Sequence, residues 1–479
     1  MNGPVPIIKN NLSVDANVNQ VKVFRDPVDS CFSYIVQLID EATPALPVTI
    51  ANPTKEAGRI TQPIALSFKA KVLVTAASPL FNGNTEQASL KNNDGKVLFN
   101  QTFIKAKWDT AAAACKKAID MCHSLGMKLY VFNPSFQQYD LTDTIKTQMS
   151  IRNAITEKWN SEIIWANTNN YTDDLQRLIS PWWDGAYLDG TVTRGELSPP
   201  LKIAEMFYSD KGVPINEDKT WDYNNRYALR KAGDSDKLYI RNGYTTVGLH
   251  FNREPRFYAD LGFDGGIYYG QGQFDDKDDA SLFNLEGKFL QKNGAGKYGY
   301  SSVTGYFVKK LVQYQNVIGA SNAYSVTGYP WPTMRLADLY LLYAEALNES
   351  AGPGAEVNGY VDKVRARAGL QTVASSWANY STNPSKFSNQ DGMRAIIHQE
   401  RLIEMAFESQ RFWDLRRWKE ASKQLNAPIT GWDLLQTTPE SYYRIKVLYS
   451  QTFAQKDYFW PIADEFITSN RNLVQNIGW

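Results

Sequence analysis

Apolar residues recur at helical spacing in the first third of the chain, where they predict a series of helices. The predicted helices span about residues 27–42, 62–77 and 110–125, a segment near residue 150, and residues 161–165. The first has Asp26 at its N-cap position and Pro27 at its start, and its inward side chains are expected to be Val28, Cys31, Ile35, Leu38 and Ile39. The second ends at Ser78-Pro79 and the third at Gly126, a suitable left-handed cap.

The helical period disappears between about residues 167 and 332, where Gly, Asn, Asp and aromatic residues dominate. Two short alternating runs, residues 237–241 and 256–261, predict strands or extended segments. The glycines at 265–266 and 270–272 indicate loops, because neither phosphate-binding glycine spacing occurs. A long irregular region carried on helices is where we expect a binding site.

Residues 396–421, IIHQERLIEMAFESQRFWDLRRWKEA, combine an apolar helical line with closely spaced charges. The pattern predicts one helix with a buried face and a solvated or interfacial flank that carries three ion pairs: Glu408 with Arg411, Asp414 with Arg417, and Arg416 with Glu420. Glu400 and Glu404 share a face, so an acid–base pair with His398 as a metal ligand is an alternative. Carboxylates at this spacing are ordinary in helices and no second ligand motif follows, which favours a structural role.

Composition excludes several classes of function. The chain has 479 residues, of which 43% are hydrophobic, enough for a large core divided into more than one substructure. Its net charge is +1, from 51 basic and 50 acidic residues, which gives no electrostatic footprint for nucleic acid or an anionic membrane. No apolar run is long enough to span a bilayer, and residues 1–11 lack the apolar core of a signal peptide.

Cysteines, histidines and acidic residues do not assemble into a recognisable metal or redox motif. Cys115 and Cys122 lie about 10.5 Å apart along one predicted helix, too far for a disulfide, and with Cys31 they are expected to be small buried apolar side chains. The chain has three histidines and no CxxC motif, so no zinc site or other cofactor is predicted. The acidic cluster at residues 275–279 lacks the glycine and closing glutamate of a calcium loop, which favours a solvated loop.

Aromatic residues supply the most usable chemistry, since the chain holds 13 Trp and 27 Tyr. A sugar ring has an apolar C–H face and a rim of hydroxyls, so it packs on an exposed aromatic ring while polar side chains bind the rim. Core packing is the competing interpretation for each single residue. The candidate ligand-binding residues form three clusters in the irregular region: Trp182, Trp183 and Tyr187; Trp221, Tyr223 and Tyr227; Tyr268 and Tyr269.

Five segments resemble, in order and spacing, the motifs of one known family, the SusD/RagB family. They are AKVLVTAASPLFNG at residues 70–83, MRLADLYLLYAEALNE at 334–349, VRARAGL at 364–370, ERLIEMAFESQRFWDLRRW at 400–418 and YFWPIADEFITSNRNLVQNIGW at 458–479. The chain departs from the family pattern at Ser409 and Gln410, where the family carries Gly followed by His or Lys. The resemblance identifies the chain as a member of this family.

The resemblance implies a mainly α fold, in which a tetratricopeptide-like helical scaffold carries a large loop-rich ligand-binding insertion. We expect residues 1–166 to be scaffold, residues 167–332 the ligand-binding region, and residues 333–479 a helical region that packs back on the scaffold. Residues 3–8, GPVPII, resemble a loop that in the family follows a first pair of long helices. We therefore expect that an N-terminal portion, with the lipid anchor of the family, precedes this chain.

The function implied by the resemblance is capture of oligosaccharide or polysaccharide at the surface of Bacteroidetes-type bacteria. Such a lipoprotein of the outer membrane is non-catalytic and passes its ligand to a SusC-like TonB-dependent transporter. Three alternatives remain: a peptide-binding protein similar to the RagB branch, a glycoside hydrolase with a carboxylate pair hidden among the 50 acidic residues, and a helical adaptor without ligand.

Overall fold

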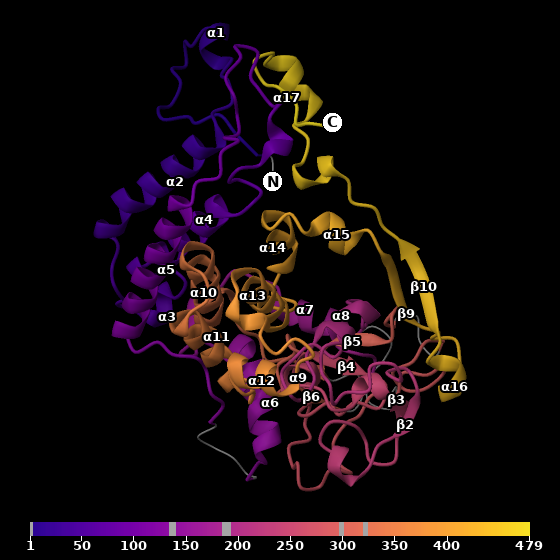
Figure 1. Cartoon of the computed structure of the whole chain (residues 1–479). Coiled ribbons are helices and arrows are strands. Elements are labelled where there is room, and N and C mark those ends of the chain that lie inside the picture. The colour runs from indigo at the N-terminus through magenta and orange to yellow at the C-terminus, as the bar shows by residue number, and fades with distance from the viewer. Residues whose placement is uncertain (1–2, 134–139, 184–192, 297–300, 320–323) are drawn as a thin grey trace.

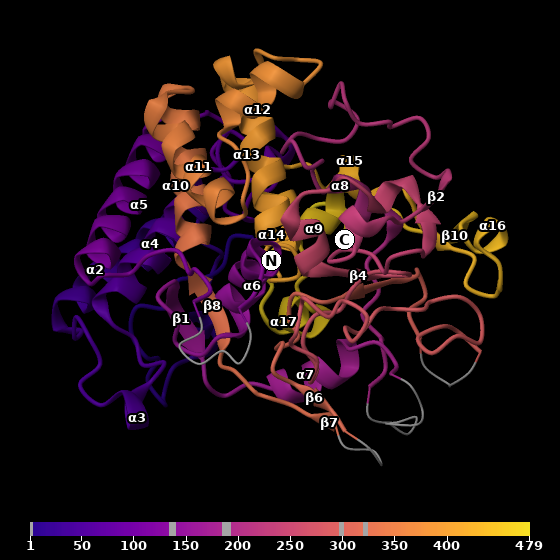
Figure 2. The same cartoon turned by 90° about the horizontal axis from the view of Figure 1, so that it is seen from below.

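The structure is a computed structural model that describes residues 3–133, 140–183, 193–296, 301–319 and 324–479. It is mainly α-helical, which confirms the predicted fold class. Helices from the two ends of the sequence lie side by side on one flank, and the loop-rich middle of the chain lies on the other (Figure 1). Seen from below, helices α2 (Val28–Ala42), α4 (Gln62–Ala77), α5 (Ala106–Ser124) and α10 (Leu336–Ala351) occupy one side, and strands β2 (Leu229–Lys231) and β4 (Leu261–Phe263) with their loops the other (Figure 2).

The helices and strands are bounded as follows. The helices are α1 (Val18–Val21), α2 (Val28–Ala42), α3 (Pro53–Glu56), α4 (Gln62–Ala77), α5 (Ala106–Ser124), α6 (Asp143–Thr156), α7 (Thr172–Ile179), α8 (Leu201–Met206), α9 (Pro255–Asp260), α10 (Leu336–Ala351), α11 (Ala355–Arg367), α12 (Val373–Tyr380), α13 (Gln390–Glu404), α14 (Arg411–Arg417), α15 (Ala421–Leu425), α16 (Pro439–Tyr442) and α17 (Asp464–Ser469). The strands form antiparallel pairs: β1 (Ile163–Asn167) with β8 (Trp331–Arg335), β2 (Leu229–Lys231) with β3 (Thr245–Val247), β4 (Leu261–Phe263) with β5 (Tyr306–Val308), β6 (Val317–Ile318) with β7 (Tyr324–Ser325), and β9 (Pro428–Trp432) with β10 (Ile445–Ser450).

The predicted early helices are present as α2, α4, α5 and α6, and α5 is followed by Gly126 at φ +77° as expected. The predicted inward face of α2 is wrong, because Val28 alone of that set is buried, while Ile35 and Leu38 are exposed. This helix packs mainly against α4 and leaves its other side open. The predicted helix at residues 161–165 is also wrong, because this segment pairs with β8 as strand β1.

The helical layer and the loop-rich region share one hydrophobic core. Helix α5 packs between α4 and α10, and α10 packs in turn against α11 and α13. Buried side chains of these helices, such as Val74 and Leu339, belong to the same cluster as Phe251 and Tyr306 of the loop-rich region. Residues 256–261, predicted as extended, are mostly helix α9, which packs against α6. The irregular region is therefore anchored by burial of its own aromatic residues.

The segment at residues 396–421 is broken and is not one helix. Helix α13 ends at Glu404, the backbone turns through Phe407 and Ser409 at φ +67° and +62°, and α14 begins at Arg411. Of the three predicted ion pairs only Asp414–Arg417 forms, at 2.8 Å. Glu408 is instead buried against Arg335. The predicted solvated flank is wrong, since the turn carries these charges into the interior.

A buried ion network joins α13 to distant parts of the chain. Its members are nearly inaccessible side chains: the cations Arg256, Lys310, Arg335, Arg365 and Arg367, and the carboxylates Glu162, Glu254, Asp260, Glu400, Glu404 and Glu408. Glu400, considered above as half of an acid–base pair, lies 2.6 Å from Arg256 and 3.2 Å from Arg365. Glu404 contacts Arg335 at 2.7 Å. Both glutamates are thus paired with guanidinium groups in the interior, as a structural role for this face of α13 requires.

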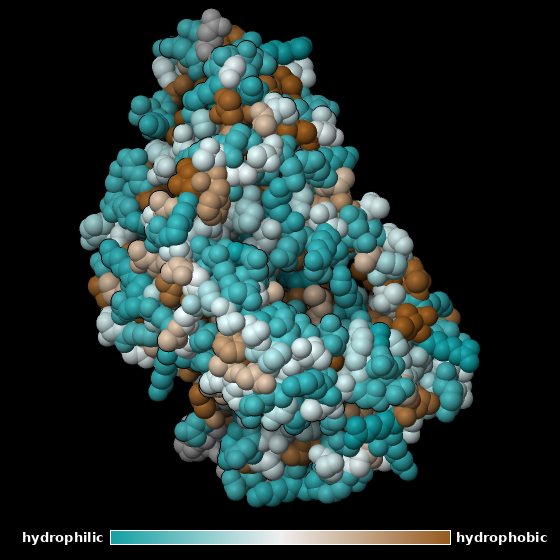
Figure 3. Space-filling model, viewed as in Figure 1, coloured by the Kyte–Doolittle hydropathy of each residue, from teal (hydrophilic) through white to brown (hydrophobic). Residues whose placement is uncertain are grey.

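The surface and the remaining candidate groups are ordinary for a globular chain. Figure 3 shows a mostly hydrophilic face with separate hydrophobic groups. Within the described residues, no helix has the length and apolarity needed to cross a bilayer. Cys115 and Cys122 are buried, as predicted, but Cys31 is only partly buried, so the prediction is wrong for this residue. The acidic cluster is only partly a solvated loop, because Asp276 is buried and accepts hydrogen bonds from the backbone and hydroxyl of Thr142 at 2.8 and 2.6 Å.

Candidate functional site

Four of the predicted ligand-binding aromatics have no exposed ring face. Trp182, Trp183, Tyr268 and Tyr269 are all almost fully buried. Trp183 packs edge-to-face on Tyr268, with 5.1 Å between ring centroids, inside a hydrophobic cluster that also holds Leu311. Burial of these rings is what anchors the irregular loops, so the structure does not support the expectation of stacking platforms at these four positions. Tyr187, the fifth candidate, lies outside the described residues.

The remaining cluster, Trp221, Tyr223 and Tyr227, is half-buried, and a neighbouring arginine covers two of its rings. The Arg226 guanidinium lies over the rings of Tyr223 and Tyr227, 4.1 and 4.3 Å from their centroids. Glu205 accepts hydrogen bonds from Arg226 at 2.9 Å and from the hydroxyl of Tyr227. Burial, with this carboxylate, raises the pKa of Tyr227. Because Arg226 covers one face of the Tyr223 and Tyr227 rings, a sugar has no free access to these faces, and the structure does not favour this cluster as a stacking platform.

An exposed tryptophan that the sequence interpretation did not select is Trp159, in the loop between α6 and β1. Its side chain is 47% exposed, and its backbone has φ +51°, a strained conformation for a bulky residue. The next residue, Asn160, fixes this conformation with its side-chain amide, which donates to three carbonyls at the end of α6: Asn153, Ala154 and Glu157, at 3.1, 3.2 and 3.0 Å. The loop is pinned while the indole projects from it.

Trp159 lines three adjoining hollows of the surface, and its indole stands between them. We call the indole and the three hollows around it the Trp159 ridge. One, of about 430 Å³, is lined by polar residues and by Tyr171 and Tyr329. Another, of about 820 Å³, is lined by Lys128, Tyr130 and Tyr314 among others. A third, of about 460 Å³, is mainly apolar. The ridge therefore has a flat ring at its centre with hydrogen-bonding groups on two sides.

The sequence held a signal for this site. Trp159-Asn160 begins two residues beyond Glu157, the C-cap of α6, and asparagine is one of the residues that tolerates turns at the end of a helix. The short helix expected over residues 161–165 hid this turn. Tyr171, which is 82% exposed, also went unselected because its neighbours form no aromatic cluster.

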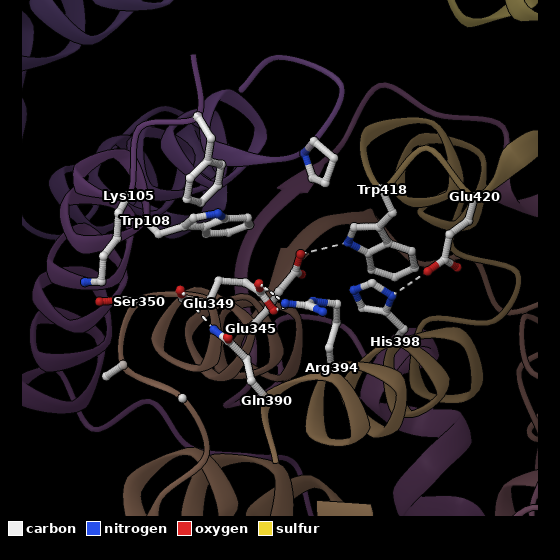
Figure 4. Close-up of a pocket in the computed structure, with 14 residues that line it drawn as sticks. Lys105, Trp108, Glu345, Glu349, Ser350, Gln390, Arg394, His398, Trp418 and Glu420 are labelled. Atoms are coloured by element: carbon white, nitrogen blue, oxygen red, sulfur yellow. Dashed lines mark hydrogen bonds and ion pairs between the residues drawn. The ribbon is translucent and has the colours of Figure 1, made fainter. Parts of the chain in front are cut away.

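A separate cavity of about 670 Å³ lies among the ends of α5, α10 and α13 (Figure 4). We call it the helical cavity. Phe103, Trp108 and Pro79 contribute apolar lining, and polar side chains of α10 and α13 line it as well. Figure 4 shows Glu349, Arg394 and Gln390 grouped on one side, with His398 between Arg394 and Glu420. Among these residues, the sequence suggested a ligand role only for His398, as the metal ligand of the alternative considered above.

Ion pairs and stacked rings hold the lining of the helical cavity. Arg394 donates to Glu349 from Nε at 2.7 Å, and Trp418 donates from Nε1 to Glu345 at 2.7 Å. Burial alone raises the pKa of Glu345, but the guanidinium of Arg417 lowers it to about 2. Glu345 therefore stays ionised at neutral pH and fixes the indole of Trp418.

Comparisons with known proteins agree with this architecture. A family model described as the SusD family matches residues 157–479. SusD-like protein P2 of Formosa agariphila is 30% identical over 332 residues, which cover 61% of this chain and 58% of that relative, less than two thirds of its length. A solved structure named BT4246 superposes with a TM-score of 0.83 at 27% identity, over 100% of this chain and 80% of that one. A SusD-like protein from Bacteroides fragilis superposes with a TM-score of 0.70 at 21% identity, over 100% and 76% of the two chains, which supports the fold alone.

Proposed function

The chain belongs to the SusD/RagB family, and from this membership we propose that it binds an oligosaccharide or polysaccharide without transforming it. We further propose that the whole protein acts at the bacterial cell surface, held at the outer membrane by a lipid anchor, and passes its ligand to a SusC-like TonB-dependent transporter. The division into scaffold (residues 1–166 and 333–479) and ligand-binding region (residues 167–332) is part of this proposal. The binding site we propose is the Trp159 ridge.

The observation that carries this site is the exposed indole of Trp159 on a turn whose backbone is held by hydrogen bonds. A strained backbone persists only where surrounding contacts enforce it, and such residues concentrate at functional sites. Here the enforcing contacts are the three hydrogen bonds from the Asn160 amide. A turn whose backbone is already fixed loses little conformational entropy when a sugar stacks on the ring that it carries. The geometry is that of a preorganised platform.

Polar groups beside the indole suit the rim of a sugar ring. The hollow shared by Trp159 and Tyr171 is lined by Asn170, Asp173 and Thr168, which offer both donors and acceptors. Tyr171 provides a second aromatic ring at the same hollow. Since residues 168, 170–174 and 328–330 line this hollow, the ridge lies at the border between the proposed scaffold and the proposed ligand-binding region.

Replacing Trp159 by alanine should weaken glycan binding by about 30-fold, because a central aromatic anchor contributes about 2 kcal/mol to a binding site. Affinity electrophoresis against a panel of polysaccharides identifies a ligand, and isothermal titration then gives the two dissociation constants. Trp159→Phe keeps a smaller ring and should lose less. Trp413→Ala, which removes another exposed tryptophan on α14, is the matched control and should bind as the parent does.

Trp159→Gly separates binding from stability. Glycine adopts positive φ without strain, so this variant should lose binding while its melting temperature stays equal or rises. Unchanged affinity in both Trp159→Ala and Trp159→Gly would refute the ridge as the glycan site. Titration of a peptide mixture that binds where no glycan does would favour the peptide-binding alternative, and release of sugar from a polysaccharide would favour the hydrolase.

A further inference from the structure

The helical cavity is a second concave site, built from elements other than those of the ridge. Its volume of about 670 Å³ falls within the range of sites that enclose small ligands. Its lining comes from the start of α5, the end of α10 and the start of α13, together with Trp418 and Glu420. The ridge instead is lined by residues near α6, β1 and α7. The two sites can therefore be altered independently.

One part of the cavity lining is apolar. Phe103 lies in the loop before α5 and is 59% exposed, so its ring is accessible to a ligand. Pro79 and the almost buried Trp108 extend this surface. A ligand with a flat C–H face gains by packing here, because the apolar area of both partners leaves water.

The charged groups of the lining already have partners, some within the lining and some behind it. Glu349 is bound by Arg394, with Nε–Oε1 at 2.7 Å, and Glu345 by Arg417, with Nη2–Oε2 at 2.6 Å. Lys105 lies 2.7 Å from Asp109, and His398 lies 3.0 Å from Glu420. Because the two arginine-bound glutamates and Lys105 each have a partner of opposite sign, a charged ligand would find no unpaired counter-ion at these groups and would lose its hydration. The chemistry favours a neutral polar ligand.

His398 offers this ligand a fixed polar atom. Its ring stacks on Trp418 with 3.5 Å between centroids and 12° between planes, and Trp418 is itself held by Glu345. Since a carboxylate only accepts, Nδ1 of His398 donates to Glu420 at 3.0 Å. Nε2 makes no hydrogen bond to the described part of the chain, which leaves one ring nitrogen for a hydroxyl of a ligand.

We propose that the helical cavity is a second binding site, for one or two neutral sugar rings. The C–H face of a ring packs on Phe103, and its hydroxyls bind Nε2 of His398 and the outer lone pairs of Glu349 and Glu420. The chemical class of this ligand rests on the proposed function, whereas its neutrality and size rest on the cavity alone. Occupation of both sites by one chain would give the protein two points of attachment on a long glycan.

Nuclear magnetic resonance of the histidine rings tests this site directly. The chain has three histidines, His123, His250 and His398, so its spectrum contains few ring signals. The signal of His398 is identified as the one that is missing in the His398→Gln variant. Cellobiose, laminaribiose and maltose are the probes. At least one of them should shift the His398 signal in a saturable manner and leave the buried His250 unchanged. If none shifts His398 at concentrations that saturate ordinary sugar sites, the inference is wrong.

Two exposed phenylalanines provide a matched pair of variants. Phe103→Ala should raise the dissociation constant of the bound disaccharide about 10-fold or more. Phe466→Ala, which removes a phenylalanine of similar exposure, 57%, on α17, should leave it unchanged. Equal affinities in the two variants and the parent would show that Phe103 takes no part and would overturn the site.

The two sites fail separately. If a polysaccharide binds and Trp159→Ala abolishes this binding while no probe shifts His398, the proposed function stands and the second site falls. If a probe shifts His398 in the Trp159→Ala variant as in the parent, the second site stands without the ridge. If no glycan and no disaccharide binds the parent, both proposals fail together.

Discussion

Replacement of Glu404 by alanine should destabilise the protein by about 3–5 kcal/mol, the usual cost of removing one partner from a buried ion pair. The carboxylate lies 2.7 Å from Arg335 and 3.4 Å from Arg256, and it also contacts Arg367. Burial raises its pKa, but the three guanidinium groups together with Lys310 lower it far below the ordinary value of 4.5. Without it, these buried cations lose a shared counter-ion that water cannot replace.

Asp260 in the same network is the matched comparison. Burial raises its pKa to about 7 against the lowering effect of Lys310, which lies 3.6 Å away. Neither of its oxygens accepts a hydrogen bond from the described residues. The charged form of Asp260 is therefore costly, and Asp260→Asn, which removes this cost, should not lower the free energy of unfolding near neutral pH. The two variants each remove one carboxylate from the same network, and they are expected to differ strongly in their free energy of unfolding.

The pH dependence of the two residues has opposite sign. The Glu404 contribution is complete above pH 4.5, the ordinary pKa, and is lost as the pH falls from there through the depressed pKa of the folded state. The Asp260 contribution is complete below pH 3.8 and is lost as the pH rises through about 7. Urea unfolding across this range measures both. Equal stability losses in Glu404→Ala and Asp260→Asn would contradict the assigned roles.

The sequence predicts the helical framework well because its signals are local. Helix α4 begins and ends where the apolar period and the Ser78-Pro79 break place its ends, and α5 is followed by Gly126 as expected. The break after Glu404 escaped prediction because its cause is long-range. Helical spacing continues through Glu408, but this residue pairs with Arg335, 73 positions away in the sequence. The one local sign of this turn was the glycine that the family pattern carries at the position of Ser409, because glycine adopts positive φ readily and Ser409 has φ +62°.

The candidate site could be predicted only as a kind of chemistry. The expectation that aromatic side chains bind sugar survives as a proposal, but Trp183 and Tyr268 pack against each other inside the core. Composition counts aromatic rings and does not tell a ring that anchors a loop from one that projects out of it. Trp159 projects because Asn160 holds the backbone of the turn, an effect of hydrogen bonds between residues 153 and 160 that hydrophobic patterning does not report.

Gly270→Ala should cost about 4 kcal/mol or more, whereas Gly126→Ala should cost about 1–2 kcal/mol. Both glycines have positive φ, +100° and +77°, so both variants pay for a left-handed backbone. A Cβ at Gly126 meets nothing within 4 Å, but one at Gly270 would lie 2.3 Å from the carbonyl oxygen of Tyr314.

The overlap at Gly270 involves backbone, which no side-chain rotation relieves. The same Tyr314 carbonyl accepts a hydrogen bond from the amide of Gln271 at 2.9 Å, so moving it away also breaks this bond. Urea unfolding of the two variants isolates the cost of the close approach, since the backbone term is common to both. Equal losses of stability in the two variants would mean that the loop at residues 270–272 can shift to accommodate the added Cβ. It would also mean that Arg152, which donates to the neighbouring carbonyl of Tyr269 at 3.0 Å, does not hold this loop in place.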